Sequence, residues 1–80
     1  MYTIQFKGKS GKQLNRLDKN IRIHYATLFD QIMDNPFIGK LGETTYHAHV
    51  KYHWVAVWEV DKNTKTITIT YIGSREGAPY

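Results

Sequence analysis

Two histidines and a lysine alternate along one stretch of the chain, in the order His47, His49, Lys51. If the stretch is a β-strand, side chains two residues apart lie on one face, about 7 Å from each other. That separation is similar to the spacing of successive phosphates along a nucleic-acid strand, roughly 6–7 Å. Histidine can act as general base or acid near neutral pH, and lysine can stabilise a charged phosphorane. The pattern could therefore serve RNA cleavage by attack of the ribose 2′-hydroxyl, a reaction that requires no metal or cofactor.

The same alternation also fits an ordinary polar strand face that carries no chemistry. A zinc site is a further alternative, because His53 could approach His47 and His49. The chain contains no cysteine, however, and the histidine spacing matches no known set of zinc ligands. We therefore expect no metal site.

A second pair of candidate residues lies at the end of the chain. Arg75 follows the last strand-like run and could bind a phosphate through two parallel hydrogen bonds. Tyr80 could stack on a base or assist proton transfer. Pro79 stiffens the approach to Tyr80, and the five residues after Arg75 are enough to fold the ring back toward it.

The hydrophobic pattern predicts the elements that must position these residues. Residues 2–6 alternate as a half-buried strand, and residues 14–32 carry an apolar stripe at three- and four-residue steps, which predicts helix. Ser10 is expected to cap the start of the helical region, and Asp18 to begin a second helix. Asn35 precedes a proline and is expected to end it.

The second half of the chain is predicted to form strands. Residues 37–44 contain two glycines and read as a connecting loop, and strand-like runs follow at about 45–51, 53–60 and 65–72. Short connections imply antiparallel pairing. The predicted fold is therefore α+β: an N-terminal strand, a two-helix hairpin and a three-stranded antiparallel sheet with the helices on one face. Trp54 and Trp58 are expected to face the core, and the histidines to line the open face, the one opposite the helices.

Length and composition restrict the class of protein. A chain of 80 residues supports one domain, residues 1–80. Eleven Lys and Arg against seven Asp and Glu give a net charge of +4, which favours a polyanionic partner. The absence of cysteine excludes disulfides and agrees with a cytoplasmic location. No apolar run approaches the ~20 residues of a membrane helix, and we expect no signal peptide.

Three segments resemble one known family, the RelE/ParE superfamily of bacterial and archaeal toxin–antitoxin toxins. They are the helical opening of residues 12–19, the Asp34-Asn35-Pro36 sequence, and Tyr71-Ile72-Gly73-Ser74-Arg75-Glu76 followed by Tyr80. The resemblance spans about residues 2–80 and implies the RelE-like microbial RNase fold. It also implies the toxin of a type II module, with a cognate antitoxin as its protein partner.

The resemblance further implies site residues and an activity. RelE-type members cleave messenger RNA, often in the ribosomal A site, so mRNA and the ribosome would be partners. By position in the family pattern, the implied catalytic residues are His47, His49, Arg75 and Tyr80. Lys51 matches a family arginine and is expected to bind the RNA backbone, and Lys40 and His53 are further candidate RNA-binding residues.

One position departs from the family pattern. Val55 stands where these toxins often carry an arginine that handles phosphate, so His53 or Lys51 would have to replace it. The departure keeps open the ParE-type branch, whose members inhibit DNA gyrase and are not nucleases. A chain that only binds a partner is the third hypothesis.

Overall fold

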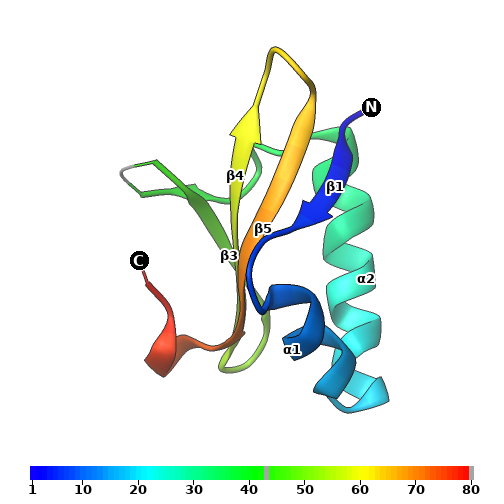
Figure 1. Ribbon diagram of the computed structural model, residues 1–80. Helices are drawn as coiled ribbons and strands as arrows, with labels where there is room; N and C mark the ends of the chain where they lie inside the picture. The colour runs from blue at the N-terminus through cyan, green and yellow to red at the C-terminus, as the bar shows by residue number, and fades with distance from the viewer. Residues whose placement is uncertain (43, 80) are drawn as a thin grey trace.

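The structure, a computed structural model, describes residues 1–42 and 44–79. The elements are β1 (Thr3–Phe6), α1 (Ser10–Arg16), α2 (Lys19–Asp34), β2 (Lys40–Leu41), β3 (Tyr46–Lys51), β4 (Trp54–Asp61), β5 (Thr66–Ser74) and a 3₁₀ turn, η1 (Arg75–Gly77). The strands form one sheet in the order β1-β5-β4-β3-β2. β1 is parallel to β5, and all other neighbours are antiparallel. Figure 1 shows α2 on one side of the sheet and the C-terminal segment on the other.

The predicted α+β architecture is confirmed, but the sheet is larger than the sequence pattern suggested. The N-terminal strand joins it at one edge, beside β5. At the other edge, Lys40 and Leu41 pair with β3, although residues 37–44 read as a loop. Both additions depend on pairing between distant segments, which a local hydrophobic pattern does not contain.

The helical region divides at Asp18, as predicted. Asp18 occupies the N-cap position of α2, although its side chain makes no capping hydrogen bond. The prediction for Ser10 is wrong, because Ser10 is the first residue of α1 and not its cap. Its buried hydroxyl lies 2.8 Å from the carbonyl oxygen of Lys7 and 2.9 Å from that of Ile69, and can donate to one at a time. Ser10 therefore ties α1 to β5.

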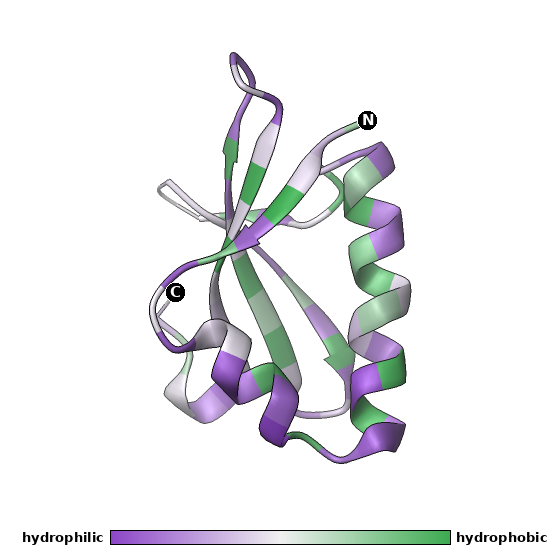
Figure 2. Ribbon diagram, turned by 45° about the vertical axis from the view of Figure 1, so that its right-hand side comes forward, coloured by the Kyte–Doolittle hydropathy of each residue, from purple (hydrophilic) through white to green (hydrophobic). Residues whose placement is uncertain are grey.

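One hydrophobic core fills the space between α2 and the sheet. Its fully or almost fully buried members are Tyr25, Leu28, Ile32, Ala56, Trp58, Ile67, Ile69 and Ile72. The indole Nε1 of Trp58 donates to the carbonyl oxygen of Pro36 at 2.9 Å, so this buried polar group is satisfied. Trp54 packs against the same core, which confirms the predicted core face of β4. Figure 2 shows hydrophobic residues along the middle strands and hydrophilic ones at the tip of the β4–β5 hairpin.

Strand β4 is buried on both faces in its middle. Val55, Ala56, Val57 and Trp58 are each 0–1% exposed. Because neighbouring side chains of a strand point to opposite faces, Val55 and Val57 lie on the face that was expected to be open. That expectation is therefore wrong for the middle of the sheet, where the C-terminal segment crosses this face.

Gly39 packs so closely against Trp58 that a methyl group has no room. A Cβ at Gly39 would lie 2.6 Å from Trp58 Cη2 and 2.8 Å from the carbonyl oxygen of His47. We expect Gly39→Ala to lower the free energy of unfolding by about 1–3 kcal/mol, because the indole or the β3 backbone must move. Urea unfolding followed by tryptophan fluorescence measures the change.

The matched control lies in the same connection. At Gly42 the nearest atom to a built Cβ is 3.4 Å away, so Gly42→Ala should change stability by less than about 0.5 kcal/mol. Equal losses in the two variants would contradict the role given to the Gly39–Trp58 contact.

Candidate functional site

Strand β3 presents His47 and His49 on the face opposite α2. The residues that alternate with them pack against the core; they are Tyr46, Ala48 and Val50. His47 is half-buried and pairs with Lys40 on one side and Val57 on the other. His49 is exposed and pairs with Val55. The strand therefore places both predicted histidines on one face.

The pairing aligns His47 with a cation. Lys40 and His47 are direct cross-strand partners, and side chains of such partners have Cβ atoms about 4.5–5.5 Å apart. The pKa of His47 is lowered, mainly by burial and further by the positive charges of Lys40 and His49. At neutral pH His47 is thus a neutral imidazole, the form that can accept a proton.

This arrangement predicts the titration of His47. Its imidazole should titrate below the ordinary value of 6.5, and Lys40→Gln should raise its pKa because one positive charge is removed. Protonation opposes folding here, so the contribution of His47 to stability is complete above about pH 6.5 and falls as the pH drops through the folded-state pKa. NMR titration of the imidazole protons measures the shift.

Lys62→Gln is the control for this titration, since Lys62 lies beside Phe37 and not beside His47. An unchanged His47 midpoint in Lys40→Gln, or an equal rise in Lys62→Gln, would contradict the effect assigned to Lys40.

Lys51 departs from the simple alternation. The pairing of β3 with β4 shifts register between His49 and Lys51, so that Lys51 pairs with Trp54, a residue that packs on the core side. The Lys51 ammonium lies 5.7 Å from the ring centroid of Tyr52, which is 82% exposed in the turn to β4. The line of side chains expected from His47 to Lys51 therefore ends at His49, and Lys51 is the last residue of β3, next to the β3–β4 turn.

Arg75 lies at the same end of the sheet. Its backbone N–H donates to the carbonyl oxygen of His53 at 2.7 Å, which joins the start of η1 to the β3–β4 turn. The side chains of Arg75 and His53 are both exposed, and the His53 ring is 5.0 Å from that of Trp54. Tyr80 lies outside the described residues. The end of β3 beyond His49, where the chain turns into β4, therefore brings together three predicted site residues: Lys51, His53 and Arg75.

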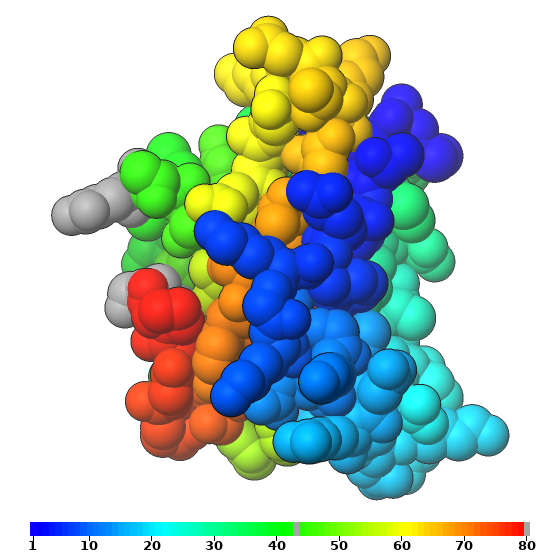
Figure 3. Space-filling model, in the orientation of Figure 1, coloured from blue at the N-terminus to red at the C-terminus, as the bar shows by residue number. Residues whose placement is uncertain are grey.

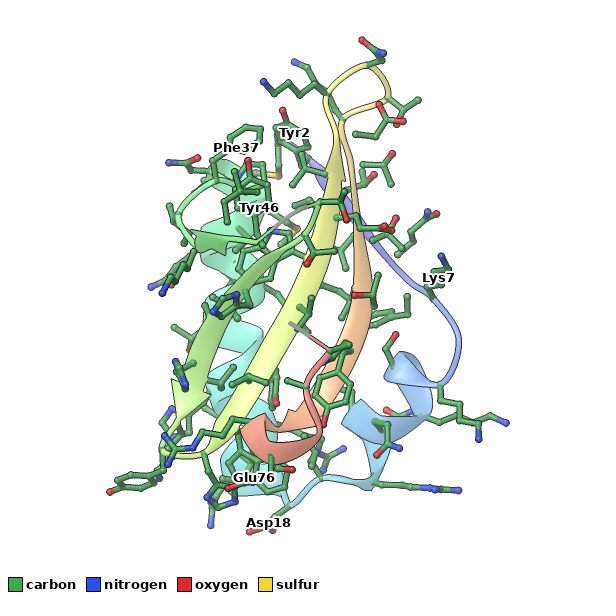
Figure 4. The ribbon with its side chains drawn as sticks, turned by 90° about the vertical axis from the view of Figure 1, so that its left-hand side faces the viewer. Tyr2, Lys7, Asp18, Phe37, Tyr46 and Glu76 are labelled. Atoms are coloured by element: carbon green, nitrogen blue, oxygen red, sulfur yellow. The ribbon has the colours of Figure 1, made fainter. Side chains whose placement is uncertain are left out.

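Tyr71 holds the C-terminal segment against the sheet, a role that the sequence analysis missed. Its hydroxyl donates to the carbonyl oxygen of Ser74 at 2.8 Å. A Cβ on Gly73 or Gly77 would lie 2.7 or 3.0 Å from the same hydroxyl oxygen, so the two glycines leave room for the ring. Figure 4 shows the C-terminal segment in front of β4 and β5, with β3 uncovered beside it. In the sequence, the available signal for this contact was the spacing of Tyr71, Gly73 and Gly77.

Tyr25, on α2, contacts the backbone of β4 and β5 close to where the C-terminal segment begins. Its hydroxyl donates to the carbonyl oxygen of Val55 at 2.7 Å within the core. Burial raises its pKa far above the ordinary value, while a hydrogen bond with the Gly73 backbone opposes the shift. Val55 and Gly73 are paired on β4 and β5, and His49 pairs with Val55. Tyr25 thus secures the backbone that supports His49 and leads into Arg75.

The Tyr71 contact predicts a local effect. Tyr71→Phe removes the hydrogen bond to Ser74 and should increase amide exchange at Arg75 and Ala78 by about 5-fold, since a typical hydrogen bond contributes roughly 1 kcal/mol. Hydrogen exchange followed by NMR measures this. Tyr52→Phe is the control, because Tyr52 is exposed. Unchanged exchange in Tyr71→Phe would show that the hydroxyl does not hold the segment.

The described residues contain neither a metal cluster nor a membrane helix. Within 1–42 and 44–79, no three His, Cys, Asp or Glu side chains lie close enough together to hold a metal ion. His47, His49 and His53 are therefore not gathered as ligands. In the same part of the chain, no helix has the length and apolar character needed to cross a membrane.

Comparison of the sequence with protein-family models and with curated proteins finds no match. Solved structures do match. A chain of the intact Escherichia coli RelBE toxin–antitoxin complex is 16% identical, with a TM-score of 0.85 over 92% of this chain and 96% of that one. The archaeal RelE–RelB complex from Pyrococcus horikoshii matches at 17% identity and a TM-score of 0.77, over 96% and 98% of the two chains.

A third match is the toxin–antitoxin complex RelBE2 from Mycobacterium tuberculosis. It is 19% identical, with a TM-score of 0.74 over 92% of this chain and 98% of that one. At such identities the likeness shows the fold, and the fold expected from the resemblance is confirmed. Residue roles must be argued from this chain itself.

Proposed function

From its RelE-like fold, we propose that this chain is the toxin of a type II toxin–antitoxin module and cleaves messenger RNA at the ribosome. The observation that carries the nuclease proposal is the pair His47 and His49 on one face of β3, with the pKa of His47 lowered by burial and further by the charge of Lys40. An imidazole that is neutral at pH 7 next to an exposed second histidine supplies a base and an acid on one face.

In the proposed reaction, side chains of this chain transfer the protons and stabilise the charge. His47 removes the proton from a ribose 2′-hydroxyl, and the oxygen attacks the adjacent phosphorus. His49, in its protonated form, gives a proton to the departing 5′-oxygen, which leaves a 2′,3′-cyclic phosphate and a 5′-hydroxyl. Arg75 stabilises the charged phosphorane through its guanidinium.

The remaining predicted residues have supporting roles in this proposal. Lys40, Lys51 and His53 contact the RNA backbone from β2 and the β3–β4 turn. Tyr80 would stack on a base beside the scissile phosphate. In this proposal the ribosome holds the message in the geometry for in-line attack. Because the site has few polar groups, this positioning makes the larger contribution to the rate.

A cognate antitoxin is the proposed protein partner. Several solved structures with this fold contain a RelB antitoxin together with the toxin. By analogy, the antitoxin of this chain would block access of the message to the exposed face of β3.

The test is induced expression of variants, with message ends mapped by primer extension. Arg75→Ala, and separately His47→Ala combined with His49→Ala, should reduce cleavage by at least about 100-fold, because each removes transition-state charge stabilisation or proton transfer. Arg22→Ala and His24→Ala on α2 are the matched controls and should cleave normally. Growth arrest with cuts at the same codons in the site variants would refute the assignment.

One observation favours a second function, inhibition of DNA gyrase. Val55 is fully buried and its carbonyl accepts the hydrogen bond from Tyr25, so no phosphate-binding side chain stands at this position. A gyrase inhibitor would leave message intact on induction and activate the DNA-damage response. The primer-extension experiment above separates the two functions directly.

A further inference from the structure

Ten residues contribute the entire net charge of the chain. Segment 7–16 contains four cations, Lys7, Lys9, Lys12 and Arg16, and no Asp or Glu. The whole chain has 11 Lys and Arg against 7 Asp and Glu, a net charge of +4. Without the segment, seven cations balance seven anions. The positive charge is therefore local, and the name basic segment is used below for residues 7–16.

Helix α1 presents three of these cations on one face. Lys9, Lys12 and Arg16 are separated by three and four residues, the spacing of neighbours along one side of a helix. All three are exposed, whereas Ser10 and Leu14 face β5 and the core. At 1.5 Å per residue, Lys9 and Arg16 lie about 10 Å apart along the axis. The three side chains form a short row.

Lys7 extends this row toward the sheet. Its backbone N–H donates to the carbonyl oxygen of Ile69 at 2.9 Å, which fixes the residue just after β1 to β5. Its side chain is exposed, and Figure 4 shows it at the edge of the molecule above α1. Figure 3 shows the segment lying across the front of β5. Lys7 and Ser10 thus fix the start of the segment to β5.

The charges are not neutralised within the protein. Among the described residues, none of the four cations forms an ion pair. The first turn of α1 contains no acidic residue, and Lys9 stands at its N-cap position. Positive charge near a helix N-terminus is unfavourable by about 0.3–1 kcal/mol. The chain tolerates this cost and keeps the cations available to an external anion.

The basic segment is separate from the histidines of β3. Helix α1 packs on β5, with Leu14 against the core on the side of α2, whereas His47 and His49 lie on the opposite face of β3. Strand β4 lies between β5 and β3, so about 10 Å of sheet separates the two positions at 4.7–4.9 Å per strand. The C-terminal segment occupies part of that distance (Figure 4). A single stretch of RNA at His47 and His49 does not need the basic segment, which points to a different ligand.

We propose that the basic segment is a second nucleic-acid contact, which binds the phosphate backbone of a duplex. It contains no aromatic residue, so it offers no platform on which unpaired bases could stack. Its one large apolar residue, Leu14, packs against the core, so no apolar anchor remains for a lipid surface. A rigid row of cations over about 10 Å suits phosphates held at regular spacing.

The test compares two variants of equal net charge. One triple variant replaces Lys7, Lys9 and Lys12 by Gln and removes three charges from the basic segment. The control triple variant replaces Arg22, Lys62 and Lys65 by Gln and removes three exposed charges elsewhere. Binding to a labelled RNA duplex, and to a DNA duplex of the same sequence, is measured by fluorescence anisotropy between 50 and 300 mM KCl. Thermal unfolding shows that both variants are folded.

The expected results distinguish binding by the basic segment from binding that depends only on the net charge of the chain. The basic-segment variant should bind the duplex at least about 10-fold more weakly at 100 mM salt, and the slope of log K against log[salt] should become shallower by about 2–3. The control variant should change affinity by less than about 3-fold. Equal binding of RNA and DNA would identify the phosphates as the ligand, and preference for RNA would add contacts to the 2′-hydroxyl.

Three outcomes would overturn the proposal. The first is equal weakening in the two variants, which would mean that only net charge matters. The second is an equal loss of affinity for single-stranded RNA and for the duplex in the basic-segment variant, which would show that the segment does not prefer paired strands. The third is tighter binding to vesicles of phosphatidylglycerol than to the duplex. Duplex binding requires no cleavage, so it stands or falls independently of the proposed nuclease activity.

Discussion

The two-sided burial of β4 is the constraint on which the rest of the structure depends. A central strand with apolar side chains on both faces cannot leave either face in water, so each needs its own cover. On one face, Ala56 and Trp58 pack in the hydrophobic core beneath helix α2. The C-terminal segment crosses the other face, which carries Val55 and Val57. Burying a side chain of this size stabilises the fold by roughly 1.5–3 kcal/mol. The return of the chain after β5 is therefore part of the fold as well as of the candidate site.

This constraint also decides where a ligand can bind. In the part of the chain that the structure describes, the C-terminal segment covers β4 and β5 and lies beside β3, on which His49 is exposed and His47 is half-buried. Tyr25, from the helix side, donates a hydrogen bond to Val55 on β4, the strand that pairs with β3, and Tyr71 donates one to Ser74 at the end of β5. The candidate site thus stands on a strand that is supported by hydrogen bonds and packing, which favours a fixed geometry over an adaptable one.

Where the sequence analysis succeeded, the signal was a local period. The apolar stripe of residues 14–32 has a helical repeat, and the alternation in β3 separates the histidines from Tyr46, Ala48 and Val50. It failed at Ser10, at Lys51 and at Lys40–Leu41. Ser10 bonds to a strand far along the chain, the register shift moves Lys51 out of line, and the short strand exists only because β3 lies beside it. Each failure involves a partner outside the local window.

The sequence by itself determined the two helices, the four longer strands, the alternating histidines, and a positive charge concentrated in residues 7–16. These properties follow from side-chain type and spacing, which need no knowledge of distant partners. The tertiary structure alone decided which face of the sheet remains uncovered, that Lys40 stands beside His47, and that Arg75 meets the β3–β4 turn. The physical reason is that strand pairing and close packing join segments far apart in the chain, and these contacts set the burial and the electrostatic neighbours on which the pKa of His47 depends.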